Sequence, residues 1–216
     1  MTLAGVRECA LAAADALELA RDELCRLDSP AGDGDHGVTM ALAAHAVRKA
    51  LDAAPDASGA DLLVRLAAAA GSVGGASGPL YASALLAAAT TVRQAGPDIA
   101  TVPLVASCAE AAQAAIVNLG HAKPGDKTML DALDPAVRSL RETSHTEMGD
   151  ALAQAATAAH AGAAATAQMT AAAGRARVLG EHSRGFADPG ATSLAIIIEA
   201  AASACRARPP RSAARP

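Results

Sequence analysis

The stretch DSPAGDGDHGVTM, residues 28–40, contains three aspartates and a histidine within nine positions, separated mainly by small residues. The two glycines between the aspartates allow a tight turn, so the carboxylates of Asp28, Asp33 and Asp35 are expected to converge. Converging carboxylates repel one another strongly unless a cation neutralises them. Because helical patterns lie on both sides of the stretch, it predicts a metal site in a loop between two helices.

The rest of the chain also predicts helices. Hydrophobic residues make up 52% of the 216 residues and aromatic residues only 1%, so alanine, leucine, valine and isoleucine must build the core. We find no convincing alternating strand pattern. We therefore predict an all-α domain over residues 1–207 and a disordered Pro/Arg-rich tail over residues 208–216. Periodicity and cap signals predict eight helical segments, at residues 2–26, 37–53, 60–71, 79–95, 101–119, 127–143, 145–173 and 189–207.

Three helix starts carry recognisable cap residues. Asp188 followed by Pro189 is a favourable cap and first-turn pair. Ser144 with Glu147 predicts a capping box, and Asp126 is a candidate cap for the sixth segment. The glycines and prolines concentrate in four connections, at residues 28–37, 71–79, 120–125 and 174–190.

Several functional classes are disfavoured. A net charge of −4 and a pI near 5.8 give no basic face for nucleic acid. Two uncharged runs, residues 66–92 and 151–174, are interrupted by glycines or diluted by polar residues, so we interpret them as buried helices and expect no membrane association. The four cysteines are scattered without a CxxC pair, which favours reduced thiols and a cytoplasmic location.

The oxygen-rich cluster favours a hard cation. Counted from Asp33, Gly37 and Ala44 stand where a calcium-binding EF-hand needs an oxygen ligand and a glutamate, so Mg²⁺ fits better than Ca²⁺. In the alternative interpretation the aspartates are solvated or cap the next helix. His36 could be a zinc ligand, but a hydrogen bond to a phosphate or a carboxylate suits its neighbours better.

The other three loops suggest phosphate binding. The sequence GSVGGASGPLY at 71–81 places small residues before a helix start, where backbone N–H groups can hold an anion. The sequence GHAKPGDKT at 120–128 differs from a P-loop by one inserted residue and follows no strand. The loop at 174–190 supplies arginines that could complement phosphate. Together these loops predict a magnesium nucleotide site, but we find no acceptor site for a second substrate.

The chain resembles the nucleotide-binding L subunit, or L domain, of dihydroxyacetone kinases. The motifs that match in order and spacing are DxxxxGDGDHG at 28–37, VGGASGPLY at 73–81, PGDKTMLDAL at 124–133 and GRAxxLGExSxGxxDPGATS at 174–193. The resemblance implies an eight-helix antiparallel barrel with the nucleotide, ADP or ATP, in loops at one end. Asp28, Asp33 and Asp35 would hold two Mg²⁺ ions, and Arg175 would be catalytic. The nucleotide site would be lined by His36, Gly37, Val38, Thr39, Ala76, Ser77, Gly120, Met129, Arg175, Asp188, Pro189 and Gly190.

The resemblance also implies a partner. In the family a separate K subunit or domain binds the keto sugar, and the L component delivers the phosphoryl group from ATP or from ADP recharged by a phosphotransferase-system protein. The chain departs from the family pattern at Thr39, often asparagine, and at Arg177 and Val178, often serine and tyrosine. The sequence thus predicts a phosphotransferase subunit for dihydroxyacetone or a related ketose. The alternative function is a noncatalytic Mg-nucleotide sensor that acts on a regulator.

Overall fold

The computed structural model describes residues 3–96 and 101–207, and this part of the chain is helical without a strand. The prediction of an all-α fold is therefore confirmed, whereas the expected tail at 208–216 lies outside the described residues. The helices are α1 (Leu3–Leu19), α2 (Arg21–Asp28), α3 (His36–Asp52), α4 (Gly59–Gly71), α5 (Ser77–Ala95), α6 (Val102–Gly120), α7 (Leu130–Glu142), α8 (Met148–Ala165) and α9 (Pro189–Arg206), with 3₁₀ segments η1 (Thr166–Gln168) and η2 (Arg175–Ser183) before α9.

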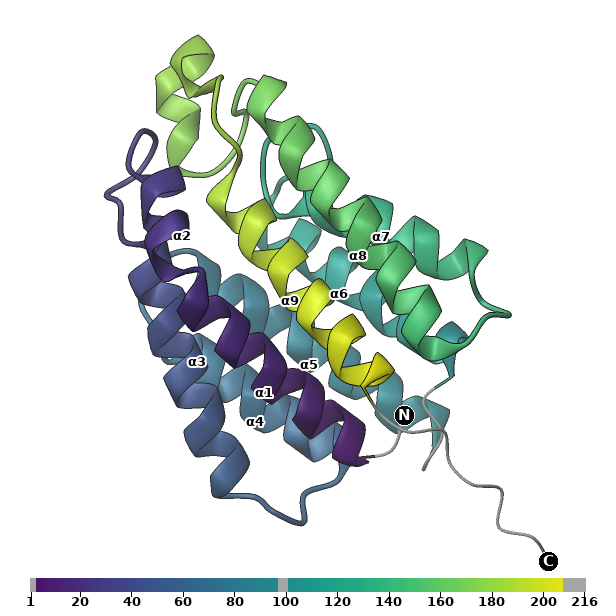
Figure 1. The fold of residues 1–216 in the computed structure, drawn as a ribbon. Coiled ribbons are helices and arrows are strands. Elements are labelled where there is room, and N and C mark those ends of the chain that lie inside the picture. The colour runs from purple at the N-terminus through teal and green to yellow at the C-terminus, as the bar shows by residue number, and fades with distance from the viewer. Residues whose placement is uncertain (1–2, 97–100, 208–216) are drawn as a thin grey trace, which may run out of the picture.

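The α-helices form a closed ring (Figure 1). From α3 to α9 each helix packs against the next one along the chain, and α1 closes the ring by packing against both α9 and α3. The first expected segment, 2–26, is divided into α1 and α2 by a turn at Ala20, and α2 packs against α3 and α9. With α1 and α2 counted as one wall, the result is the expected eight-helix antiparallel barrel.

The alternating direction of the helices brings four connections to the same end of the barrel. These are residues 29–35, 72–76, 121–129 and 166–188, which follow α2, α4, α6 and α8. They correspond to the four glycine- and proline-rich connections of the sequence. Figure 1 shows η2, in light green, at this end near the loop that follows α2. The topology therefore gathers the candidate chemistry at one end of the barrel.

The predicted caps have mixed outcomes. Asp188 caps α9 as expected, because its Oδ2 accepts a hydrogen bond of 2.7 Å from the backbone of Ala191. The capping box of Ser144 and Glu147 does not form, since α8 begins one residue after Glu147, which itself occupies the cap position without a side-chain bond. Asp126 does not cap α7, which begins at Leu130; its Oδ2 instead accepts from the backbone of Lys123 at 2.9 Å.

Small residues allow the helices to approach closely. A Cβ atom at Gly162 on α8 would lie 2.0 Å from the carbonyl oxygen of Asp131 on α7, so this crossing requires glycine. The interior also contains a partly open apolar cavity of about 400 Å³, lined mainly by alanine, leucine and valine side chains of α1, α3, α5 and α6. The shortage of aromatic side chains is consistent with a barrel whose centre is incompletely filled.

By length and composition alone, α6 could cross a membrane, with a mean hydropathy of 1.4. In the structure it packs between α5 and α7 as part of the barrel wall. Neither uncharged run of the sequence forms one long α-helix, because residues 72–76 separate α4 from α5 and α8 ends at Ala165.

Candidate functional site

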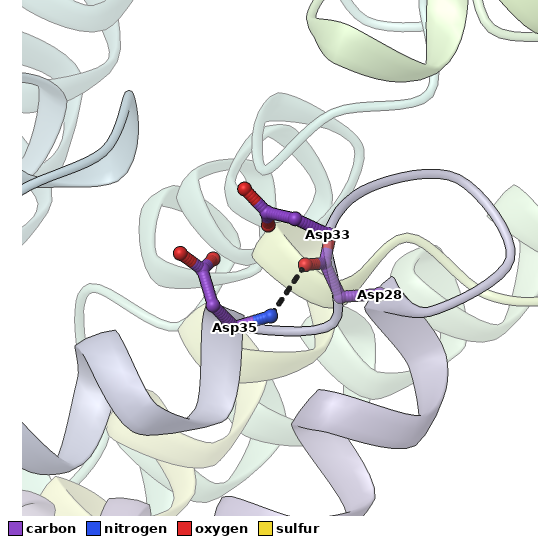
Figure 2. A group of neighbouring side chains, drawn as sticks. All are labelled: Asp28, Asp33 and Asp35. Atoms are coloured by element: carbon purple, nitrogen blue, oxygen red, sulfur yellow. Dashed lines mark hydrogen bonds between the residues drawn. The ribbon is translucent and has the colours of Figure 1, made fainter.

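Three aspartates meet where α2 leads into α3 (Figure 2). Asp28 ends α2 and is buried, whereas Asp33 and Asp35 are exposed in the loop. Each can offer a carboxylate oxygen such that all three atoms lie within 4.8 Å of one another. The Oδ2 atom of Asp28 also accepts hydrogen bonds from the backbone of Asp35 at 3.1 Å and of His36 at 3.4 Å. The cluster predicted from the sequence is therefore formed, and its innermost carboxylate is held by the backbone.

The loop reaches this geometry because of its glycines. A Cβ atom at Gly32 would lie 2.3 Å from Oδ1 of Asp28, and Gly34 has a φ of 75°, in the left-handed region. A larger residue at the first position would displace the Asp28 carboxylate. The two glycines of the sequence GDGD therefore allow the carboxylates of Asp28, Asp33 and Asp35 to converge.

Arg175 supplies positive charge to the cluster. This residue is the first of η2, and its guanidinium forms ion pairs with Asp33, with Asp35 at 3.4 Å and with Asp28 at 3.8 Å. The pKa of Asp33 is lowered, first by a hydrogen bond with the side chain of Asp35 and then by the guanidinium of Arg175. The loop before α9 is thereby tied to the loop before α3, although 142 residues separate Arg175 from Asp33.

The donor set fits a magnesium ion. It consists of carboxylate oxygens alone, which are the ligands that hard divalent cations prefer, and two of the three side chains face solvent, so a bound ion could keep waters. The guanidinium of Arg175 neutralises part of the negative charge of the cluster. Asp28, Asp33 and Asp35 are therefore able to hold Mg²⁺.

His36 lies beside the cluster as the first residue of α3, and it is buried. Its Nδ1 atom is 3.5 Å from the hydroxyl of Ser77, the first residue of α5, and its Nε2 atom is 3.0 Å from the hydroxyl of Ser193 on α9. Burial lowers the pKa of His36, an effect that the charge of Asp28 opposes. His36 therefore connects the N-terminal ends of α3, α5 and α9 through its two side-chain contacts.

A second group of predicted residues surrounds the start of α9. Gly190 lies next to Met129, since a Cβ atom at Gly190 would be 3.9 Å from the Met129 Cβ. Burial raises the pKa of Asp188 to about 6, partly offset by its hydrogen bond from Ala191 and by the charge of Lys127. Ser193 links this group to His36, because its hydroxyl also donates to the carbonyl of Gly190 at 3.1 Å.

The remaining predicted residues differ in position. Ala76 immediately precedes α5, and Gly120 ends α6 beside Leu80 of α5. Val38 is 39% exposed on α3, where Thr39 is partly buried. Gly37 is buried, and a Cβ atom there would lie 1.9 Å from the carbonyl oxygen of Arg21. The close approach of α2 and α3 therefore explains this glycine without a nucleotide contact.

Lys127 has a role that the sequence did not reveal. In the loop that differs from a P-loop by one residue it is only 2% exposed, and its Nζ donates to the carbonyls of Thr166 and Phe186, both at 2.6 Å. Burial lowers the pKa of Lys127, while Asp188 and then Asp131 oppose that change. The lysine holds the connection before α9 in place instead of extending toward a phosphate. Ser193 and Tyr81 were also missed, because a buried hydroxyl leaves no spacing signal.

Comparison with known proteins identifies a family. The DAK2 domain matches residues 30–203. The ADP-binding subunit DhaL of the PEP-dependent dihydroxyacetone kinase of Escherichia coli (strain K12) is 36% identical over 193 residues, covering 85% of this chain and 88% of that subunit. The L-erythrulose 1-kinase of Mycolicibacterium smegmatis is 40% identical over 206 residues, covering 91% of this chain and 36% of that enzyme.

A solved structure has the same fold. The dihydroxyacetone kinase of C. freundii in complex with AMP-PNP and Mg²⁺ superposes with a TM-score of 0.71 at 29% identity, over 92% of this chain and 33% of that one. This chain thus spans about a third of the length of that kinase and of the M. smegmatis erythrulose kinase, which are 33% and 36% covered. It spans most of the E. coli subunit, 88% of which is covered.

Proposed function

The chain belongs to the DAK2 domain family, and we propose that it is a phosphotransferase subunit that binds magnesium-ADP or magnesium-ATP. In this proposal it transfers the terminal phosphoryl group of bound ATP, or of ADP recharged by a phosphotransferase-system protein, to dihydroxyacetone or a related small ketose held by a partner, and ADP is left on the subunit. The observation that carries the proposal is the cluster of Asp28, Asp33 and Asp35 beneath the guanidinium of Arg175, at the end of the barrel where α3, α5 and α9 begin.

The aspartates would hold two Mg²⁺ ions, which supply positive charge to the nucleotide phosphates when bound. Asp28 is the fixed member, because two backbone N–H groups already bind one of its oxygens. Asp33 and Asp35 are exposed and can adjust to a ligand. The similar C. freundii kinase, which was crystallised in complex with AMP-PNP and Mg²⁺, supports this assignment.

The nucleotide would lie across the helix starts. The backbone N–H groups that follow Ala76 and Pro189 begin α5 and α9, where the helix dipole favours negative charge. The other residues predicted to line the nucleotide site would complete it: His36, Gly37, Val38, Thr39, Gly120, Met129 and the turn Asp188–Gly190.

Arg175 would be the catalytic residue. The guanidinium of Arg175 contacts the proposed metal-binding carboxylates of Asp33 and Asp35. From this position it would stabilise the negative charge on the phosphoryl group during its transfer from ATP to the acceptor. Such electrostatic stabilisation is effective when it is stronger in the transition state than in the resting complex. In this arrangement the chain would position the nucleotide and stabilise the charge of the transferred phosphoryl group, without forming a covalent intermediate.

A K-type subunit would hold the acceptor sugar. The E. coli relative, which has nearly the length of this chain, is named as the ADP-binding subunit of a PEP-dependent kinase, and two longer relatives are named as erythrulose kinases. These names support a small ketose as acceptor and a separate sugar-binding chain. They also leave two phosphoryl donors to be distinguished, free ATP and a phosphotransferase-system protein.

The test is reconstitution. The purified chain is mixed with a K-type subunit, Mg²⁺ and ATP, and phosphorylation of dihydroxyacetone and of erythrulose is measured. The same mixture is assayed with ADP and a phosphotransferase-system donor in place of ATP. We expect a phosphorylated ketose only when both subunits are present. Tight Mg-ADP binding with no transfer under either condition would favour the noncatalytic sensor.

A further inference from the structure

A fully buried serine joins three helices next to the aspartate cluster. Ser193 lies in the first turns of α9 and is 0% exposed. Its hydroxyl oxygen is 3.0 Å from Nε2 of His36 on α3 and 3.0 Å from the hydroxyl of Tyr81 on α5. These contacts connect the inside of the barrel to the residue that follows the metal-binding loop.

The direction of each hydrogen bond follows from the number of hydrogens. A serine hydroxyl has one hydrogen and two lone pairs. Ser193 donates its hydrogen to the carbonyl of Gly190 at 3.1 Å, which leaves two positions that accept. The single hydroxyl hydrogen of Tyr81 fills the first position. The second position must therefore accept a hydrogen from Nε2 of His36.

This assignment also determines the protonation of Nδ1, the other nitrogen of the His36 ring. A neutral ring with its hydrogen on Nε2 has a bare Nδ1, which can only accept. That atom is 3.5 Å from the hydroxyl of Ser77, so Ser77 is the donor. Both ring nitrogens of His36 are then engaged within the protein, and the backbone of Pro189 is a further hydrogen-bond partner of the imidazole beside Ser193. In this arrangement His36 would act on a phosphate indirectly, through Ser77, whereas the sequence predicted a hydrogen bond from His36 itself to a phosphate or a carboxylate.

We propose that Ser193 and Tyr81 are positioning residues, which hold His36 in its Nε2–H tautomer so that Nδ1 fixes Ser77 at the start of α5. The inference deepens the proposed function and rests on it, because Ser77 belongs to the proposed nucleotide site. Ser193 acts through His36 and does not touch the nucleotide. Loss of its hydroxyl would loosen the relative placement of α3, α5 and α9 around the phosphates.

The tautomer can be measured directly by ¹⁵N NMR of the histidine side chains, without nucleotide and at about pH 8, where imidazole is neutral. In the wild type we expect His36 to have a protonated Nε2 and a bare Nδ1. Ser193→Ala should convert it to a mixture of tautomers. The control Thr143→Val removes another buried hydroxyl, which follows the end of α7 and donates to the carbonyl of Ser139 on that helix, and it should leave the signals of His36 unchanged. Protonated Nδ1 in the wild type, or an unchanged spectrum in Ser193→Ala, would overturn the proposal.

Affinity for Mg-ADP provides the second measurement. Ser193→Ala should bind about tenfold more weakly than the wild type, since a hydrogen bond that orders the site is lost. Tyr81→Phe, which keeps the ring, should give a smaller loss of Mg-ADP affinity. If Ser193→Ala does not fold, the NMR and affinity measurements are made on Tyr81→Phe instead. Wild-type affinity in both variants would contradict the positioning role. Failure of the wild type itself to bind Mg-ADP would count against the proposed function, while the NMR result would still decide the tautomer.

Discussion

Replacing Asp188 by asparagine should remove a pH-dependent cost of folding. The Asp188 carboxylate begins α9, where its Oδ2 accepts the Ala191 N–H at 2.7 Å. Burial raises its pKa from 3.8 to about 6, although the hydrogen bond and the charge of Lys127 oppose the change. Asparagine retains a side-chain oxygen that can cap the helix, and it has no proton to lose.

The sign follows from proton linkage. Between pH 3.8 and about 6 the folded protein keeps a proton on Asp188 that the unfolded chain releases, so the free energy of unfolding falls as pH rises through this window. A pKa rise of about two units corresponds to about 3 kcal/mol. Because Asp188 is only partly buried, solvent screens part of this cost, and we expect about 2 kcal/mol. The cost is absent below the window and complete above it.

The assay is urea unfolding of the metal-free and nucleotide-free protein at about pH 4 and pH 7, followed by far-UV circular dichroism because the chain has no tryptophan. Relative to the wild type, Asp188→Asn should gain about 2 kcal/mol between the two pH values. Asp56→Asn, an exposed change at the opposite end of the barrel, serves as the control. An equal difference at both pH values would refute the assigned shift.

Two further substitutions test the catalytic and packing arguments. Arg175→Ala should lower the rate of phosphoryl transfer in the reconstituted system by about 10²-fold, with a much smaller effect on the affinity for Mg-ADP; equal losses would make it a binding residue. Gly162→Ala should destabilise the barrel by about 3 kcal/mol in urea unfolding, since the new Cβ would lie 2.0 Å from the Asp131 carbonyl; wild-type stability would show that α7 and α8 can separate at no cost.

Much of the site could be predicted because the chain is an up-and-down barrel. In such a barrel alternate connections lie at one end, so four glycine-rich loops far apart in sequence come together once the helices are recognised. The aspartate cluster is local to one loop and was predicted from spacing alone. The ion pair between Arg175 and Asp33 joins two different loops, and the sequence, which placed both residues at one site, did not predict this contact.

The features that the sequence did not predict depend on contacts between distant segments. The turn at Ala20 and the absence of the box at Ser144 follow from where helices pack, which local cap preferences do not encode. The end of α8 has a similar cause, because the hydroxyl of Thr166 donates to its own helix while accepting from the backbone of Asp188 at 2.8 Å. Lys127 looked like part of a phosphate loop, but its two carbonyl partners come from distant segments.

Metal-dependent nucleotide binding by the aspartate cluster is tested most directly by calorimetric titration of ADP into the purified chain with Mg²⁺, repeated with EDTA in place of the metal. We predict binding that requires Mg²⁺ and that falls by about tenfold or more in Asp33→Asn and in Asp35→Asn, each of which replaces one of the three negatively charged carboxylates by a neutral amide. Asp56→Asn should bind ADP as the wild type does. Equal ADP affinity with and without Mg²⁺, or wild-type affinity in both cluster variants, would contradict the assignment of these aspartates to the metal.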